Sequence, residues 1–127
     1  MQGLQAQYPY QVPIDAYGNG GFRFADMSHI GSLLCLPSGI KAWQMSVVSA
    51  ADLRPEDFAA ILAEAEHIDV LLFGTGSTHV SPAQAVRTAC AAAGIGIEPM
   101  TTGSAARTYN ILLGERRKVA AALIAVD

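Results

Sequence analysis

The sequence predicts a single α/β domain with three layers, in which helices flank a central mixed β-sheet and an antiparallel β-meander comes first. The chain has 127 residues, which suits one domain. Apolar and polar residues alternate with period two near its start, and helix-like and strand-like segments alternate in the rest. Hydrophobic residues make up 51% of the chain and charged residues 15%, so the composition supplies a core and excludes intrinsic disorder.

Charge and cysteine content limit the partners and the compartment. With 8 basic and 11 acidic residues the net charge is −3, which gives no electrostatic support for nucleic-acid binding. Cys35 and Cys90 lie far apart without a CxxC motif, and this favours reduced, buried thiols over a disulfide. No apolar run is long enough to cross a membrane. We therefore predict a cytoplasmic protein with no integral membrane segment.

The N-terminal part is predicted to be an arm followed by short strands. Residues 1–21 mix tyrosines with prolines and end on the turn signal Gly18-Asn19-Gly20-Gly21, so they form an arm or an edge strand ahead of a domain at 22–127. Short alternating or apolar runs separated by turn residues then predict the meander. Its strands are expected at 22–24, 31–37 and 40–43.

The remaining elements alternate between helix and strand. Phe58, Ile61, Leu62 and Ala65 recur at helical spacing, and Ser81-Pro82 is a typical helix start. Glycines end the second and third helices. The expected order is helix 55–66, strand 69–73, helix 81–94, strand 95–100, helix 105–113 and strand 119–126.

Two loops at the ends of predicted strands form the candidate ligand site. One loop follows a buried strand and the other opens a helix, whose free N–H groups carry partial positive charge. Arg107 and Asn110 lie three residues apart on that helix and share one face, so a pocket for an anion or a carbonyl is expected. The predicted ligand-binding residues are Gly74, Thr75, Gly76, Ser77, Thr101, Thr102, Arg107 and Asn110.

Structural roles compete with this interpretation. Glycine-threonine loops also end strands by supplying turn geometry and capping hydroxyls. Arg107 alone would also fit a solvated surface arginine, or a structural clamp on a strand-end carbonyl or on the Glu98 carboxylate, and such a clamp is favoured over a catalytic role. Tyr109 has the spacing of a core ring, whose buried hydroxyl would need one hydrogen-bond partner.

Several enzyme classes lose support because their motifs are absent or incomplete. Gly74-x-Gly76 follows a strand, but His79 stands where a dinucleotide-binding motif needs its third glycine. No P-loop and no GxSxG nucleophile elbow occur. His29 and His67, like His79, lack neighbours at ligand spacing, so we predict no metal site and no cofactor. Catalytic residues stay unassigned, and the charged run at 115–118 is expected to be a solvated loop.

Four segments in order carry a resemblance to a known family. They are 70–76 (VLLFGTG), 94–102 (GIGIEPMTT), 105–110 (AARTYN) and 119–124 (VAAALI). The chain resembles a family of small, largely uncharacterised bacterial and archaeal α/β proteins whose eukaryotic relatives include a mitochondrial respiratory complex I assembly factor. The resemblance covers about 22–126, and it implies a mixed sheet flanked by helices and a cleft between the Gly74 loop and the Arg107 helix. It implies no established catalytic activity.

Two functions are consistent with these observations. The first is a non-catalytic binding or assembly module with a protein partner, and the family resemblance favours it. The second is a protein or enzyme that binds a small anionic or carbonyl compound at the candidate site. A homodimer is a further expectation, because an arm that carries Tyr8 and Tyr10 could pair with the sheet edge of a second copy.

Overall fold

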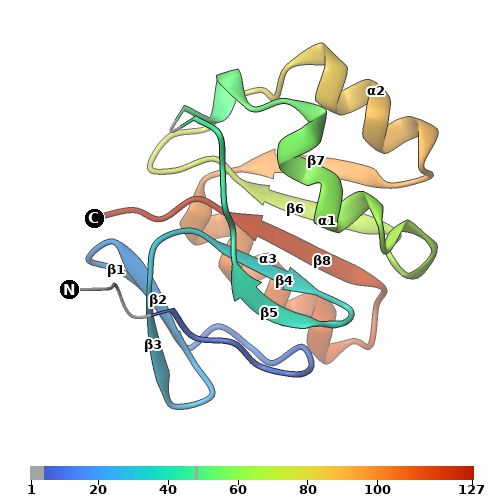
Figure 1. The fold of residues 1–127 in the computed structure, drawn as a ribbon. Coiled ribbons are helices and arrows are strands. Elements are labelled where there is room, and N and C mark those ends of the chain that lie inside the picture. The colour runs from blue at the N-terminus through green and yellow to red at the C-terminus, as the bar shows by residue number, and fades with distance from the viewer. Residues whose placement is uncertain (1–4, 48) are drawn as a thin grey trace.

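The central layer of the structure, a computed structural model that describes residues 5–47 and 49–127, is a mixed five-stranded sheet (Figure 1). Its strand order is β5-β4-β8-β6-β7. The strand β6 pairs in parallel with β7 and β8, while β4 pairs antiparallel with β8 and β5. The strands are β4 (Leu33–Leu36), β5 (Gly39–Ala42), β6 (Val70–Gly74), β7 (Gly96–Met100) and β8 (Val119–Leu123).

A separate three-stranded antiparallel sheet lies on one side of the molecule, with the order β1-β2-β3. Its strands are β1 (Ala16–Gly18), β2 (Gly21–Phe24) and β3 (Met27–Ile30). The first hairpin turns through Asn19 and Gly20, which have φ angles of 52° and 79°, as a tight two-residue hairpin requires.

An antiparallel meander is therefore present, but two of the strands predicted for it lie in the other sheet. The sequence also does not predict the strand at Met27–Ile30. The strands predicted at 31–37 and 40–43 form the β4–β5 hairpin of the central sheet. The reason is visible in their burial, because all four residues of β4 are buried and a strand covered on both faces belongs in the middle layer.

One face of the central sheet is covered by α1 (Ala59–Leu62), α2 (Gln84–Ala92) and short 3₁₀ turns. These turns are η1 (Ala50–Asp52), η2 (Pro55–Phe58) and η3 (Ala65–His67). The core on this face is built around Trp43, Phe58 and Phe73, whose rings meet edge to face at centroid distances of 5.5–6.1 Å. Cys90 also lies in this core, whereas Cys35 lies in the other one. Both cysteines are buried and free, as predicted.

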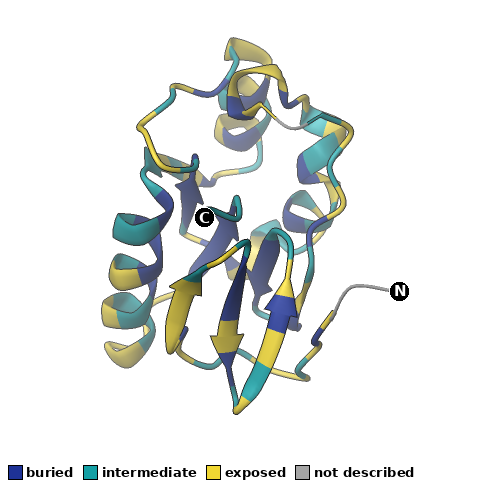
Figure 2. Cartoon of the chain, turned by 90° about the vertical axis from the view of Figure 1, so that its left-hand side faces the viewer, coloured by how far each residue is buried: buried dark blue, intermediate teal, exposed yellow. Residues whose placement is uncertain are grey.

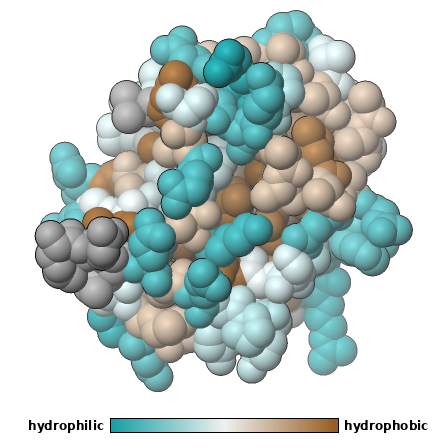
Figure 3. Space-filling model, viewed as in Figure 1, coloured by the Kyte–Doolittle hydropathy of each residue, from teal (hydrophilic) through white to brown (hydrophobic). Residues whose placement is uncertain are grey.

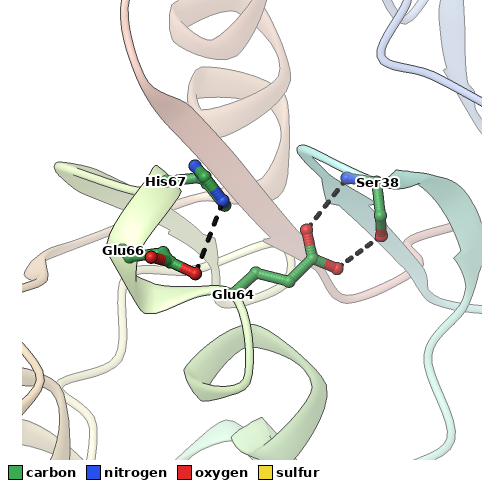
Figure 4. Close-up of polar contacts among 4 residues, drawn as sticks. All are labelled: Ser38, Glu64, Glu66 and His67. Atoms are coloured by element: carbon green, nitrogen blue, oxygen red, sulfur yellow. Dashed lines mark hydrogen bonds and ion pairs between the residues drawn. The ribbon is translucent and has the colours of Figure 1, made fainter.

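The continuous helix predicted at 55–66 is wrong. The chain forms two 3₁₀ turns and a single α-helical turn there, because the backbone leaves α geometry at Phe58 (φ −104°, ψ 10°) and Glu64 (φ −111°, ψ 19°). The Glu64 carboxylate reaches the tip of the β4–β5 hairpin, where it accepts hydrogen bonds from the Ser38 hydroxyl and from the Ser38 N–H at 2.9 Å (Figure 4). The neighbouring His67–Glu66 pair, 3.6 Å apart, is exposed and contributes little.

The other face of the sheet is covered by α3 (Thr102–Gly114) and by the three-stranded sheet, which completes the three predicted layers. Alternation along β8 divides its alanines between the layers. Ala121 lies in the core under α3, while Ala120 and Ala122 lie in the core under α1 and α2. Figure 2 shows these strands as a buried centre inside helices whose outer sides are exposed.

Helix limits also differ from the prediction. The helix α2 begins at Gln84 rather than at Pro82, because Ala83 is still extended (φ −58°, ψ 150°) and no side chain caps the helix. The helix α3 begins earlier than predicted, at Thr102, where Thr101 is the N-cap and accepts a hydrogen bond from the Ser104 N–H at 3.3 Å.

The described part of the N-terminal arm packs against its own chain. Tyr8 forms an antiparallel bridge with Ile40 of β5, and Ala6 and Ile14 are buried in the α3-side core. Tyr8 and Tyr10 stack edge to face at 5.0 Å.

Candidate functional site

The three parallel strands β6, β7 and β8 end on the same side of the central sheet, and the loops that carry the predicted ligand-binding residues follow β6 and β7 there. The strand β6 leads into α2 on one face, and β7 leads into α3 on the other face. In Figure 1 these strand ends point to the left, where the C-terminal residues and the β1–β2 hairpin also lie. Helices that diverge from neighbouring parallel strands open a crevice, which is the usual ligand position in α/β sheets.

The two predicted loops meet through buried hydroxyl groups. The Thr102 hydroxyl accepts a hydrogen bond from the Gly76 N–H at 3.0 Å and donates one to the Ile124 carbonyl at 2.7 Å. The Thr102 N–H donates to the Gly76 carbonyl at 2.9 Å. The side chain of Thr75 donates to the Thr78 carbonyl at 2.6 Å and accepts from the Val80 N–H at 3.1 Å.

These contacts give the two threonines a structural role beneath the crevice. Thr102 is 0% exposed and Thr75 6% exposed, so neither hydroxyl faces solvent. Gly74 lies below as well, where an added Cβ would come within 3.0 Å of Leu123 and of the Thr102 backbone. The structure therefore brings Gly74, Thr75, Gly76 and Thr102 together as a support for the crevice floor.

A hollow of about 470 Å³ lies above this floor. The predicted residues Gly76, Ser77 and Thr101 line it, together with Tyr17, Gly103 and residues 125–127. A carboxylate, that of Asp127, is the charged group of this lining.

The other two predicted residues, Arg107 and Asn110, lie in an adjacent hollow of about 330 Å³. The hollows share Tyr17 and Gly103. Arg107 is exposed and shares its hollow with the Asp15 carboxylate, which lowers the local positive potential.

Asn110 is committed to the fold. Its side-chain oxygen accepts a hydrogen bond from the Ile14 N–H at 2.8 Å, and its amide group donates to the Ile14 carbonyl at 2.8 Å. The amide thus pairs with Ile14 as a neighbouring strand would, so its main hydrogen bonds are made within the fold. Tyr109 is the core ring that the sequence predicted, and its hydroxyl donates to the Val12 carbonyl at 2.9 Å.

Tyr17 is a crevice residue that the sequence did not indicate. Its ring lies against the first turn of α3, where a Cβ added to Gly103 would stand 2.3 Å from the Tyr17 hydroxyl oxygen. Glycine at this position leaves room for the Tyr17 ring, and a larger residue would displace that ring. A glycine in the first turn of a helix signals close contact, but the sequence offers no means of identifying the contacting residue 86 positions earlier.

The buried thiols and phenol stay neutral near pH 7. Burial raises the pKa of the Cys35 thiol to about 12, against a smaller lowering by its hydrogen bond with Tyr109. Burial also raises the pKa of Tyr109 and that of Cys90. In the described ranges, no group of three or more His, Cys, Asp or Glu side chains is placed to hold a metal ion.

Comparison with known proteins places this architecture in a family. The family described as "Protein of unknown function (DUF498/DUF598)" matches residues 14–124. This chain belongs to that family. The match begins at Ile14, the residue that Asn110 binds, and it spans all eight strands and the three α-helices of the described residues. The resemblance predicted from the sequence is confirmed.

Other DUF498/DUF598-like relatives include both uncharacterised and named proteins. An uncharacterised protein of Rhodobacter capsulatus is 39% identical over 113 residues, which span 89% of this chain and 84% of that protein. The mouse NADH dehydrogenase [ubiquinone] 1 alpha subcomplex assembly factor 3 is 32% identical over 125 residues. That alignment spans 95% of this chain but only 64% of the mouse protein.

Solved structures share the fold. A crystal structure from Bartonella henselae, described as an outer membrane protein, superimposes with a TM-score of 0.87 at 47% identity and covers 94% of this chain and 99% of that one. A Rhodopseudomonas palustris protein gives a TM-score of 0.80 at 43% identity, with 95% and 88% coverage. In the part of this chain that the structure describes, no helix has the length and apolar character needed to cross a bilayer.

Proposed function

We propose that this chain is a protein-binding module that assists the assembly of a larger protein complex. The observation that carries the proposal is the 32% identity with a complex I assembly factor over 125 residues. Because the similarity spans 95% of this chain, the shared feature is the whole domain rather than a local motif. A cytoplasmic location, suggested by the composition, is part of the same proposal.

The internal use of the polar groups supports binding rather than catalysis. Thr75, Thr102 and Asn110 direct their side chains to the backbone of neighbouring segments. Large apolar side chains remain at the surface for contact with a protein, and Tyr10, Ile30 and Ile111 are each more than half exposed. On the face shown in Figure 3, beige and brown apolar groups extend from the centre toward the upper right, beside hydrophilic groups. Exposed apolar surface of this kind is typical of protein interaction sites.

Deletion of the gene in its own host tests the proposal. We expect less fully assembled NADH dehydrogenase on native gels, with recovery when the intact chain is supplied again. A respiratory complex that assembles at the normal rate and to the normal level in the deletion strain would contradict this function.

A second candidate function is the binding of a small anionic or carbonyl compound, and the crevice at the strand ends favours it. The two hollows adjoin at Tyr17 and Gly103, and the Arg107 guanidinium stands beside them. Native mass spectrometry of freshly purified protein should then show a retained small molecule. Arg107→Ala should lower the occupancy of that small molecule about tenfold, because one charge-assisted contact is lost. Arg116→Ala, at an exposed arginine in the turn after α3, is the control, and equal occupancy in both variants would exclude this site.

A further inference from the structure

The two edges of the central sheet differ in their capacity to accept another strand. At one edge, β7 carries Pro99, which has no N–H to donate to an incoming strand. At the other edge, Ile40 of β5 directs both its N–H and its carbonyl away from β4 and toward the arm. The β5 edge is therefore the one built for strand pairing.

The arm occupies this edge as a short strand. The Tyr8 N–H donates to the Ile40 carbonyl at 3.0 Å, and the Ile40 N–H donates to the Tyr8 carbonyl at 2.9 Å. A Cβ added to Gly39 would stand 2.3 Å from the Tyr8 carbonyl oxygen, so glycine at this position permits the close approach. Two residues before the bridge, Ala6 is buried and its N–H donates to Nδ1 of His29 at 3.1 Å. Figure 1 shows the arm running beside β5.

The attachment of the arm is uneven along its length. Residues 5–10 are held by one backbone bridge to the edge, by the Ala6 N–H to His29 and by the packing of Ala6, while Gln5, Gln7, Pro9 and Tyr10 are exposed. Residues 11–14 are held by more hydrogen bonds: the Gln11 side chain donates to the Val119 carbonyl, and Tyr109 and Asn110 of α3 bond to Val12 and Ile14. Segment 5–10 is therefore the part of the arm with fewer hydrogen bonds to the rest of the chain.

We infer that the β5 edge is the docking site for an extended segment of the protein partner, which pairs antiparallel with Ile40 in place of Tyr8. The arm shows which partner segment would fit this edge. Such a segment forms a backbone bridge with Ile40 beside Gly39, and it carries a small apolar residue two positions before the bridging residue, in the place of Ala6. In the absence of a partner, residues 5–10 cover the edge and prevent unwanted pairing. This inference rests on the proposed function only for the existence of a protein partner.

The full-length chain and a peptide that reproduces residues 5–12 (QAQYPYQV) test the inference. Ala6→Arg places a charge in a buried position and should release the arm without altering β5. Gln7→Arg, at an exposed neighbour, is the matched control. We expect the labelled peptide to bind the Ala6→Arg chain about tenfold more tightly than the wild type or the control, because apparent affinity scales with the fraction of chains whose edge is free. The Ile40 amide of the unliganded Ala6→Arg chain should also exchange hydrogen faster than in the other two.

Several outcomes would overturn the docking site. Equal peptide binding by all three chains would contradict it, and so would an Ile40 amide that stays protected in the Ala6→Arg chain. A wild-type dimer in light scattering that Ala6→Arg abolishes would also contradict it, because the occupant of the edge would then be a second copy of the chain. Protection of the Ala121 amide reports that the Ala6→Arg sheet is folded. If it is not, Tyr8→Pro removes the arm's bridging N–H instead. The peptide experiment needs no partner protein, so its result is independent of the deletion experiment. The docking site can fail while complex assembly still depends on the chain, and the assembly function can fail while the peptide still binds.

Discussion

Asp57 joins the η2 turn to Ser46 in the preceding segment through its carboxylate. It accepts hydrogen bonds from the Ser46 N–H at 2.8 Å, from the Ser46 hydroxyl at 3.0 Å and from the Arg54 N–H at 2.8 Å. Its own carbonyl accepts the indole N–H of Trp43 at 2.8 Å. Partial burial acts to raise the pKa of Asp57, but these hydrogen bonds and the Arg54 charge outweigh it, so the pKa is lowered overall.

The lowered pKa of Asp57 predicts acid sensitivity. A carboxyl group whose pKa is lower in the folded state stabilises the fold above its unfolded value of about 4, and that contribution is lost as pH falls through the folded value. We expect Asp57→Ala to lower the free energy of unfolding at pH 7 by about 1 to 2 kcal/mol. The difference from wild type should shrink below about pH 4. Urea denaturation at both pH values measures it, and a difference that does not change with pH would contradict the assignment.

Replacement of Arg116 by glycine should stabilise the protein. It follows α3 in the left-handed region (φ 61°), where its N–H bonds the Leu113 carbonyl at 2.9 Å and the Arg117 N–H bonds the Leu112 carbonyl at 3.0 Å. Glycine usually occupies this position after a helix, because a Cβ is strained there. Arg116→Gly should therefore raise the free energy of unfolding by about 0.5 to 1 kcal/mol.

The control for Arg116→Gly is the opposite kind of change, from glycine to a residue with a Cβ, at Gly94. Gly94 has a φ of 79° after α2 and open space around its Cβ position, so Gly94→Ala tests backbone strain alone and should destabilise by about 1 kcal/mol. A thermal melt that shows Arg116→Gly to be less stable than wild type would disprove the expectation.

At the level of elements, α3 fastens the N-terminal segment to the rest of the molecule. Asn110→Asp keeps the size of the side chain but replaces its amide donor by a carboxylate oxygen that faces the Ile14 carbonyl at 2.8 Å. We expect a loss of about 1 to 3 kcal/mol in unfolding free energy and faster hydrogen exchange at Ile14. Arg107→Ala, at an exposed site one turn earlier, should change stability by less than about 0.5 kcal/mol. An Ile14 amide that stays equally protected would show that the amide clamp is dispensable.

Elements with strong local signals could be predicted, and those set by distant contacts could not. The helix α3 and the strand β6 follow from apolar spacing, caps and glycines in their own sequence. The segment 55–66 has equally good helical spacing, but Asp57 and Glu64 bond to Ser46 and Ser38, and those partners cannot be identified from spacing. Likewise, Asn110 looked available for a ligand because nothing in the sequence connects it with Ile14.

At the scale of the whole molecule, close packing in three layers depends on small residues in the central strand. Ala121 is 0% exposed beneath α3. Ala121→Leu should overpack the α3-side core and destabilise the protein by about 1 to 3 kcal/mol in chemical denaturation. Ala91→Leu on the exposed side of α2 is the control and should remain near wild type. Equal stability of the two variants would mean that the layers adjust freely.

The site was predictable to the extent that topology determines it. Parallel strands that end together bring Gly76 and Thr102 into contact, and this follows from strand order alone. The direction of each side chain depends on packing, so the burial of Thr102 and the contribution of Tyr17 required coordinates.

The hydrogen bond from Gln11 to the Val119 carbonyl joins residues 108 positions apart. Because Gln11 leaves the ribosome long before Val119, this contact cannot form until β8 has been synthesised. Contacts between residues so far apart carry a high loop-closure cost, so we expect the Gln11 contact to form late in folding.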